Sequence, residues 1–329
     1  MRRRELLKAL CGLAAGSATI PHSVARSQSA MPVIGYLSSR SSGSEGPIRE
    51  PFLKALEEAG FTPGRNVAIE YRFSEGPDDR LPALATELVG RHIVMLVATD
   101  SPSALAAKAA TATIPIVFTS GADPVQLGLV ASYNRPGGNA TGVSLFTTEL
   151  GPKRLGLVRE FLAKPGTIAF VVNPNSAATP SQVKEMQAAA QAVGQALLVV
   201  EAGTEELVDR AFAMMAEHKV AAILYGASVF FQVISERLVA LAARYRIPAL
   251  YEWREFVTAG GLMSYSTDRN EFGRVAGSYA GRILKGEKPA DLPVVQSSRF
   301  EFVINLRTAK TLGIEIPPAL LARADEVIE

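Results

Sequence analysis

Seven stretches rich in serine, threonine, asparagine and aspartate follow apolar runs of the sequence. They occupy residues 37–44, 98–104, 118–124, 172–181, 225–230, 251–255 and 264–268. Such residues could supply a nucleophile, a cradle for phosphate or a hydrogen-bonding cup for a small solute. In "FTSGADP" (118–124), Thr119 and Ser120 can donate hydrogen bonds, and Gly121 lets the backbone approach a ligand. Asp123 either caps the next helix or pairs with an ammonium group.

The motifs of the common enzyme classes are missing. Ser228 in "YGASVF" lacks the second glycine of a G-x-S-x-G stretch, and the only histidines after residue 27 are His92 and His218. "GGNATG" (137–142) has the wrong spacing for a dinucleotide loop and no Lys-Ser or Lys-Thr pair for a phosphate loop. No group of His, Cys, Asp or Glu has the spacing of metal ligands. We therefore expect no enzymatic activity, no cofactor and no metal site.

Two of the seven stretches, and one further pair of acids, have the sequence of a helix start. Ser101-Pro102 and Thr179-Pro180 each resemble an N-cap residue followed by proline at the first helical position. The pair Asp78-Asp79 could be two catalytic acids, but it directly precedes an amphipathic segment, so we interpret it as an N-cap. Helix amide groups that face a cleft would form a seat for a carboxylate.

The first 27 residues have the pattern of an export signal. A basic start precedes a short apolar run over about 6–20, which is shorter than the roughly 20 residues of a membrane span. Arg3-Arg4 resembles the twin-arginine motif, although the general secretory route stays open, and cleavage fits equally well after Ala25 or Ser27. The segment has five basic residues and one acid, so its removal changes the formal net charge from +2 to −2. We expect a periplasmic protein without a membrane span.

Ten short apolar runs alternate with amphipathic segments over the rest of the chain, which predicts an α/β fold with parallel sheets. The runs are 32–37, 66–72, 93–98, 114–118, 140–145, 167–172, 196–200, 220–225, 247–251 and 261–266, followed by a helix over about 268–285 and a strand near 300–304. The pattern runs twice, over about 31–145 and 150–263, and ends in a tail. This predicts two Rossmann-like lobes joined by several hinge strands, with a ligand cleft between them.

Three phrases of the sequence are distinctive: "DPVQLGLV" (123–130), "RPGGNATG" (135–142) and "FEFVINLRTAKTLG" (300–313). With them the chain resembles the ABC transporter substrate-binding proteins of the tryptophan/tyrosine-binding type. The resemblance implies a type I periplasmic binding protein fold, with lobe I at 28–146 plus about 265–292 and lobe II at 147–264 plus about 293–329. It also implies three crossovers and a small solute in the cleft. Such proteins resemble the effector domains of LacI-like repressors, but an export signal replaces the DNA-binding segment, so no nucleic acid partner is expected.

The polar strand ends supply the predicted binding residues. In open parallel sheets, ligands bind beyond the carboxyl ends of the strands. For an amino acid, hydroxyls and amides would hold the carboxylate, and Asp100, Asp123 or Glu252 would hold the amine. The predicted ligand-binding residues are Ser38, Ser39, Thr99, Asp100, Ser101, Thr119, Ser120, Asp123, Asn173, Asn175, Tyr225, Ser228, Tyr251 and Glu252.

Aromatic residues near the same strand ends are either core or ligand wall. They are Tyr225, Phe230, Phe231, Tyr251 and Trp253, with Phe146 near the hinge. The family resemblance points to an aromatic amino acid, although related binders accept other small solutes.

We expect a receptor that delivers its solute to an ABC permease and its ATPase. A periplasmic sensor that presents the solute to a receptor kinase is the alternative, since both would use cleft closure.

Overall fold

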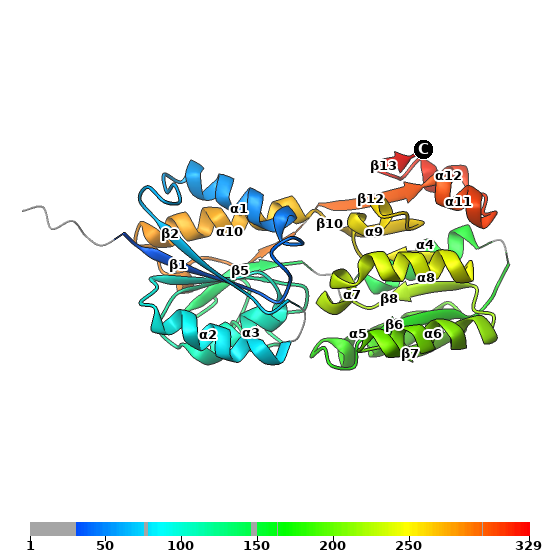
Figure 1. The fold of residues 1–329 in the computed structure, drawn as a ribbon, viewed down its shortest axis with the longest axis horizontal. Helices are drawn as coiled ribbons and strands as arrows, with labels where there is room; N and C mark the ends of the chain where they lie inside the picture. Colours follow the sequence, from blue (N-terminus) through cyan, green and yellow to red (C-terminus); the bar gives the residue numbers. More distant parts are fainter. Residues whose placement is uncertain (1–30, 76–77, 146–149, 163, 298) are drawn as a thin grey trace, which may run out of the picture. The chain divides into compact units, whose positions relative to one another are not determined.

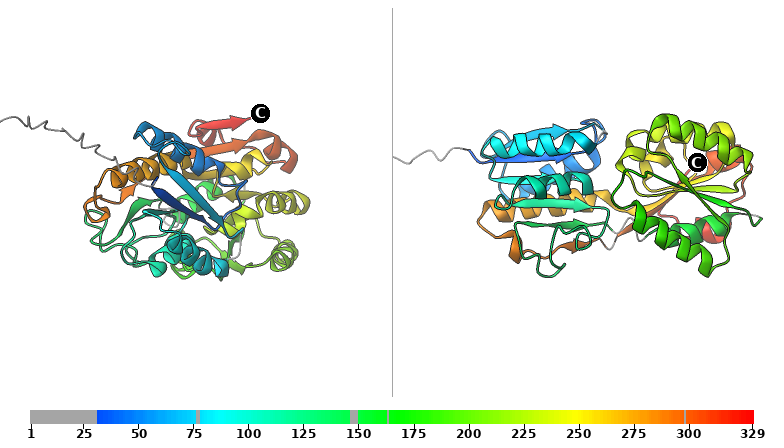
Figure 2. Two further views of the ribbon diagram at one scale, coloured as in Figure 1. Left: turned by 60° about the vertical axis from the view of Figure 1, so that its left-hand side comes forward. Right: turned by 90° about the horizontal axis from the view of Figure 1, so that it is seen from below.

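The computed structural model describes residues 31–75, 78–145, 150–162, 164–297 and 299–329. The predicted export signal and Phe146 lie outside this part of the chain. Residues 31–329 form one compact unit that contains two β-sheets with helices on both faces of each (Figures 1 and 2). This confirms the predicted α/β fold with two lobes.

The first sheet has six strands in the order β11-β5-β4-β3-β1-β2, all parallel. Its strands are β1 (Val33–Ser38), β2 (Ala68–Phe73), β3 (Met95–Ala98), β4 (Ile116–Ser120), β5 (Ala140–Ser144) and β11 (Val295–Gln296). The helices of this lobe are α1 (Gly46–Glu58), α2 (Leu81–Gly90), α3 (Ser101–Ala110) and α10 (Arg269–Leu284). Separate apolar cores lie on the two faces, with Leu88 and Phe118 in one and Phe52 and Val97 in the other. Strands covered on both sides must be apolar on both faces, as the sequence predicts.

The second sheet has the order β13-β12-β10-β9-β8-β6-β7, and β12 and β13, which are parallel to each other, run antiparallel to the other five strands. Its strands are β6 (Ile168–Val172), β7 (Leu197–Glu201), β8 (Ala222–Tyr225), β9 (Ala249–Tyr251), β10 (Met263–Thr267), β12 (Phe300–Asn305) and β13 (Glu326–Ile328). The helices are α4 (Gly151–Phe161), α5 (Thr179–Ala192), α6 (Glu205–Glu217), α7 (Val229–Val233), α8 (Ser235–Tyr245), α9 (Arg254–Thr258), α11 (Leu306–Leu312) and α12 (Pro318–Leu321). Two cores again cover the two faces.

The chain passes between the sheets between β5 and α4, between β10 and α10, and between β11 and β12. Helix α10 follows a strand of the second sheet but packs along α1 of the first lobe. Two glycines permit this contact, because a Cβ at Gly273 would lie 2.2 Å from the carbonyl oxygen of Ile48, and one at Gly277 would lie 2.3 Å from that of Phe52. Val295–Gln296, which the sequence boundary near 293 places in lobe II, pairs with β5 in the first sheet.

The helix starts differ from the sequence expectation by one to three residues. Asp100, not Ser101, caps α3, because its side chain accepts from Ser103 N at 2.8 Å. Thr179 is likewise the first residue of α5 and not its cap. The acids Asp78 and Asp79 lie in a short 3₁₀ turn, Asp78–Arg80, so α2 begins only at Leu81 and neither acid caps it.

Candidate functional site

A pocket of about 1020 Å³ lies at the carboxyl ends of the strands and is lined by residues of both lobes. From the first lobe come the segments after β1, β3 and β4, represented by Arg40, Thr99–Pro102 and Gly121–Ala122. From the second lobe come the segments after β6, β8 and β9. This is where ligands bind in open parallel sheets. Of the predicted binding residues, those in the lining are Thr99, Asp100, Ser101, Asn173, Asn175, Ser228 and Glu252.

Tyr225 and Tyr251, predicted as ligand residues, are instead part of the second lobe's core. Their rings stack on each other with centroids 5.4 Å apart, and Tyr251 also stacks on Phe256 at 4.8 Å. Burial raises the pKa of both phenols. Both are the last residues of their strands, and at that position the side chain faces the helices, whereas the following residue at β9, Glu252, lines the pocket.

Ser38 and Ser39 are fully buried and hold acids of the first lobe in place. Ser38 Oγ donates to Glu45 Oε2 at 3.0 Å, while the backbone N and the Oγ of Ser39 each donate to Asp100 Oδ2 at 2.9 Å. Neither serine is in the pocket lining. Both therefore act on the site through Asp100 and Glu45.

The end of β4 and the loop after it carry Thr119, Ser120 and Asp123, and this loop lines the pocket at Gly121 and Ala122. Ser120 Oγ lies 2.9 Å from Ser101 Oγ and donates to the carbonyl oxygen of Ala122 at 2.8 Å. Thr119 is buried below it. Asp123 starts a turn and not a helix, since its Oδ1 accepts from Val125 N at 2.8 Å. These three side chains are outside the lining, whereas Gly121 and Ala122 are in it.

Arg40 is a lining residue that the sequence analysis misses, although it is the one cation in the strand-end stretch 37–44. It is 4% exposed, and its Nη1 donates to the carbonyl oxygen of Thr99 at 3.0 Å and lies 3.4 Å from Asp100 Oδ2. Burial acts to lower the pKa of Arg40, but Glu45 and Asp100 outweigh it and raise the pKa above its usual range. Asp100 therefore has a cationic partner within the protein, which it shares with Glu45.

Glu252 differs from Asp100 because no arginine or lysine nitrogen of the described residues lies within 4 Å of its carboxylate. It lines the pocket and is 5% exposed. Burial raises its pKa, and the more distant charges of Arg154, Arg269 and Arg40 offset this only in part. A buried carboxylate without an ion pair is costly, so a cationic group in the pocket would be stabilised there.

Thr99 contributes a hydroxyl without a partner. The residue lines the pocket and is 1% exposed, and its Oγ1 makes no hydrogen bond with any described residue. Most buried polar side chains are paired, so an unpaired hydroxyl in a pocket wall marks a position that a ligand could satisfy.

The second lobe offers polar groups around the start of α5. Asn173 Nδ2 donates to Ser228 Oγ at 3.1 Å, and Asn173 Oδ1 accepts from Asn175 N at 3.0 Å. Helix α5 has 14 residues, and its N-cap, Ala178, provides no side-chain hydrogen bond. Because residues 175–178 line the pocket, the positive end of this helix faces it.

The remaining wall is apolar and acidic. Leu105, Leu127, Val229, Phe230 and Trp253 are among the apolar lining residues. Among the described residues, the lining contains six acids and one base, Arg40; the acids are Glu75, Asp78, Asp79, Asp100, Glu205 and Glu252. The balance favours a ligand with a positively charged group over an anion.

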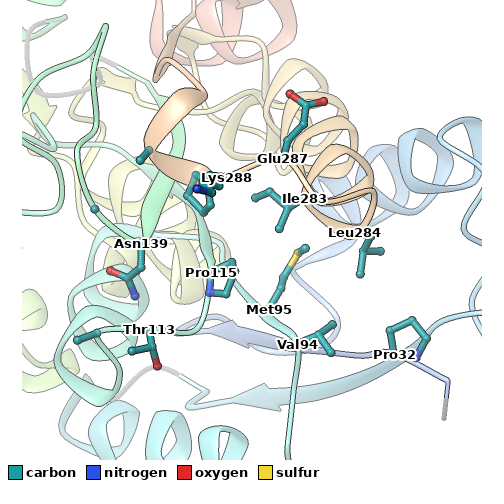
Figure 3. Close-up of a pocket in the computed structure, with 15 residues that line it drawn as sticks. Pro32, Val94, Met95, Thr113, Pro115, Asn139, Ile283, Leu284, Glu287 and Lys288 are labelled. Carbon is teal, nitrogen blue, oxygen red and sulfur yellow. The ribbon is translucent and has the colours of Figure 1, made fainter. Parts of the chain in front are cut away.

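A second hollow, of about 640 Å³, lies at the amino ends of β1, β3 and β4 (Figure 3). Pro32, Val94 and Pro115 precede these strands and line it together with Ile283 of α10. Its amide side chain, Asn139, is satisfied within the protein, because Nδ2 donates to the carbonyl oxygens of residues 111 and 114. No predicted site residue lies in this hollow.

Within the described ranges, no three or more His, Cys, Asp or Glu residues are arranged to hold a metal ion. In the same part of the chain, every helix is too short or too polar to span a bilayer.

Comparisons with known proteins place the chain in a family. The family described as "ABC transporter substrate binding protein" matches residues 41–328, and the chain belongs to it. A tyrosine-binding protein of Clostridioides difficile is 28% identical over 268 residues, which cover 81% of this chain and 76% of that protein. An ABC domain from Streptococcus pneumoniae in complex with L-Trp is 27% identical with a TM-score of 0.82, and a conserved domain protein from Vibrio cholerae is 28% identical with a TM-score of 0.84. Both alignments cover 90% of this chain and 99% of the other. The family binds substrates and does not transform them, so this chain is not an enzyme.

Proposed function

We propose that this member of the ABC transporter substrate-binding protein family binds an aromatic amino acid in the pocket between its lobes and delivers it to a membrane permease. The observation that carries the proposal is Glu252, a buried carboxyl on the pocket wall without an ion pair within 4 Å among the described residues. An α-ammonium group would supply the missing charge. The related tyrosine-binding protein and the related complex with L-Trp support the choice of ligand.

The carboxylate of the ligand would bind at the second lobe. The uncapped amino end of α5 faces the pocket, and the pair Asn173–Ser228 lies at the ends of the neighbouring strands β6 and β8. Backbone amides at a helix start bind carboxylates through hydrogen bonds and through the helix dipole. This end of the pocket therefore complements Glu252: one region suits an anion and the other a cation.

The side chain of the ligand would contact the apolar wall. Phe230 is half-buried on this wall, and Leu105 and Leu127 line it from the first lobe. An aromatic pair contributes about 0.5–1.5 kcal/mol beyond the area that it buries. Phe230 is the aromatic wall residue that can stack on a ligand, because the ring of Trp253 already packs against the guanidinium of Arg269 at 3.8 Å.

Family membership and the export pattern of residues 1–27 support delivery of the solute from the periplasm to a permease that works with an ATPase. Import needs a receptor that exists in solute-bound and solute-free conformations. Two lobes joined by three crossovers allow such a change as a rigid-body motion.

Isothermal titration with three related compounds tests the ligand class. L-tyrosine has both charged groups, tyramine lacks the carboxylate, and 3-(4-hydroxyphenyl)propionate lacks the amine. We expect L-tyrosine to bind best and the propionate to bind least, because it adds a negative charge beside Glu252 and five other acids. If the propionate binds as tightly as L-tyrosine, the pocket does not recognise an ammonium group and the proposal fails.

A further inference from the structure

The side-chain oxygen of Gln232 accepts hydrogen bonds from two arginines. Arg40 Nε donates to Gln232 Oε1 at 3.1 Å, and Arg269 Nη2 donates to the same oxygen at 2.8 Å. Gln232 is on α7 of the second lobe, Arg40 follows β1 of the first lobe, and Arg269 is the first residue of α10. One amide oxygen therefore connects three segments that are distant in sequence.

Both arginines are anchored on their other sides. Arg40 pairs with Asp100 at 3.4 Å, while Arg269 pairs with Glu255 at 3.0 Å and covers the ring of Trp253. Their side chains are 5% and 10% exposed. Two buried guanidinium groups that bond to the same oxygen repel each other. The partial negative charge of that oxygen offsets the repulsion.

Helix α7 depends on outside contacts because it has only five residues and no side-chain hydrogen bond at its N-cap, Ser228. From within the second lobe, Gln182 Nε2 donates to the carbonyl oxygen of Ala227 at 3.1 Å, and Asn173 donates to Ser228. Towards the first lobe, the contact to Arg40 is made by Gln232. Every residue from 227 to 230, together with 232–234, lines the pocket.

We infer that Gln232 is a positioning residue for solute binding: its side-chain oxygen holds α7 against Arg40, and thereby places Phe230 and Ser228 opposite Thr99. The inference rests on the proposed function, since it assigns to Gln232 the task of completing the pocket from the second lobe. In an open form Arg40 Nε would lose this acceptor and bond to water instead, whereas Arg269 would keep its contacts with Glu255 and Trp253 of the second lobe. The bond therefore favours the form in which the lobes meet and contributes little to the stability of each lobe.

Two substitutions at Gln232 distinguish the effect of its hydrogen-bond acceptor from the effect of its side-chain volume. Gln232→Met keeps the length and removes the oxygen, whereas Gln232→Glu keeps an acceptor for both arginines. Gln191→Met, on the exposed surface of α5, is the matched control. The measurements are the Kd for L-tryptophan by calorimetry, the radius of gyration of the ligand-free protein by X-ray scattering, and the melting temperature without ligand.

We expect Gln232→Met to weaken L-tryptophan binding about tenfold, which corresponds to ~1.4 kcal/mol. Its ligand-free form should be less compact than the wild type, and its melting temperature should stay close to that of the control. Gln232→Glu should bind more tightly than Gln232→Met. A loss of affinity that only parallels a loss of melting temperature would mean that Gln232 is merely structural.

X-ray scattering of the ligand-free protein tests the role of Gln232 independently of the proposed ligand. If L-tryptophan and L-tyrosine do not bind the wild type, the proposed function fails, and the radii of gyration alone decide the role of Gln232. Equal radii for wild type and Gln232→Met then overturn the inference. If the wild type binds, equal Kd values for the two proteins overturn it.

Discussion

Asn173 Nδ2 donates to Ser228 Oγ at 3.1 Å, and this bond joins the ends of two adjacent parallel strands, β6 and β8. Both residues are 8% exposed and both line the pocket. The polar wall of the second lobe is thus fixed before any solute arrives, which lowers the entropy cost of binding.

Thr99→Val should have opposite effects on stability and binding. Because Thr99 Oγ1 is buried without a partner in the described residues, its removal should stabilise the unliganded protein by about 1 kcal/mol. Binding of the amino acid should weaken about three- to tenfold if the hydroxyl bonds to it. Urea denaturation and calorimetry provide the two values. Unchanged affinity would show that the solute does not reach Thr99.

Glu252→Gln should reduce affinity for L-tyrosine by at least tenfold while the fold survives. The amide keeps the shape of the carboxyl but cannot neutralise the α-ammonium group. The exposed Glu217→Gln is the matched control, since it makes the same charge change away from the pocket. Circular dichroism confirms folding, and calorimetry measures Kd. Equal affinities of the two variants for L-tyrosine would show that Glu252 does not bind the ligand.

The affinity for the amino acid should depend on pH through Glu252. Burial raises the pKa of this carboxyl, so it becomes protonated at a higher pH than an ordinary glutamate. The ammonium group binds the ionised form, and affinity should be full above the raised pKa and fall as the pH decreases through it. In the unliganded protein the sign is reversed, because protonation relieves the buried charge and stability should rise as the pH falls through the same range. Kd and melting temperature of the Glu252→Gln variant should depend less on pH than those of the wild type, and the dependence that remains belongs to other acids such as Asp78, whose pKa burial raises to about 6.

Two glycine-to-alanine substitutions should change stability in opposite directions. At Gly277 of α10 a Cβ would lie 2.3 Å from the carbonyl oxygen of Phe52, so Gly277→Ala should cost about 1–3 kcal/mol or more. At Gly156 of α4 no atom lies within 4 Å of the added Cβ, and Gly156→Ala should stabilise the helix by about 0.5–1 kcal/mol. Chemical denaturation measures both. A neutral Gly277→Ala would contradict the close packing of α10 on α1.

Much of the fold could be predicted because buried parallel strands must be apolar on both faces, and the apolar runs identify eleven strands of the two sheets. The strands β11 and β13 were not predicted, because "VQ" and "EVI" are too short to carry a pattern. The positions of Thr99, Asn173, Ser228 and Glu252 in the pocket could be predicted from strand ends.

The roles of other residues depend on tertiary contacts that a sequence pattern does not contain. Tyr225 and Tyr251 come at the same strand ends as the lining residues, but the side-chain direction at the last strand position places them in the core. Arg40 occurs in a polar stretch that is typical of an exposed loop. It is nevertheless buried, because Asp100, Glu45 and Gln232 surround it.

The crystal structure of the purified protein with L-tryptophan tests the central claim most directly. The account predicts one ligand in the pocket of 1020 Å³, with its ammonium nitrogen within 4 Å of the Glu252 carboxylate and its carboxylate at the start of α5. A ligand found in the hollow at the amino ends of β1, β3 and β4, or a ligand in the main pocket with its ammonium group away from Glu252, would contradict it.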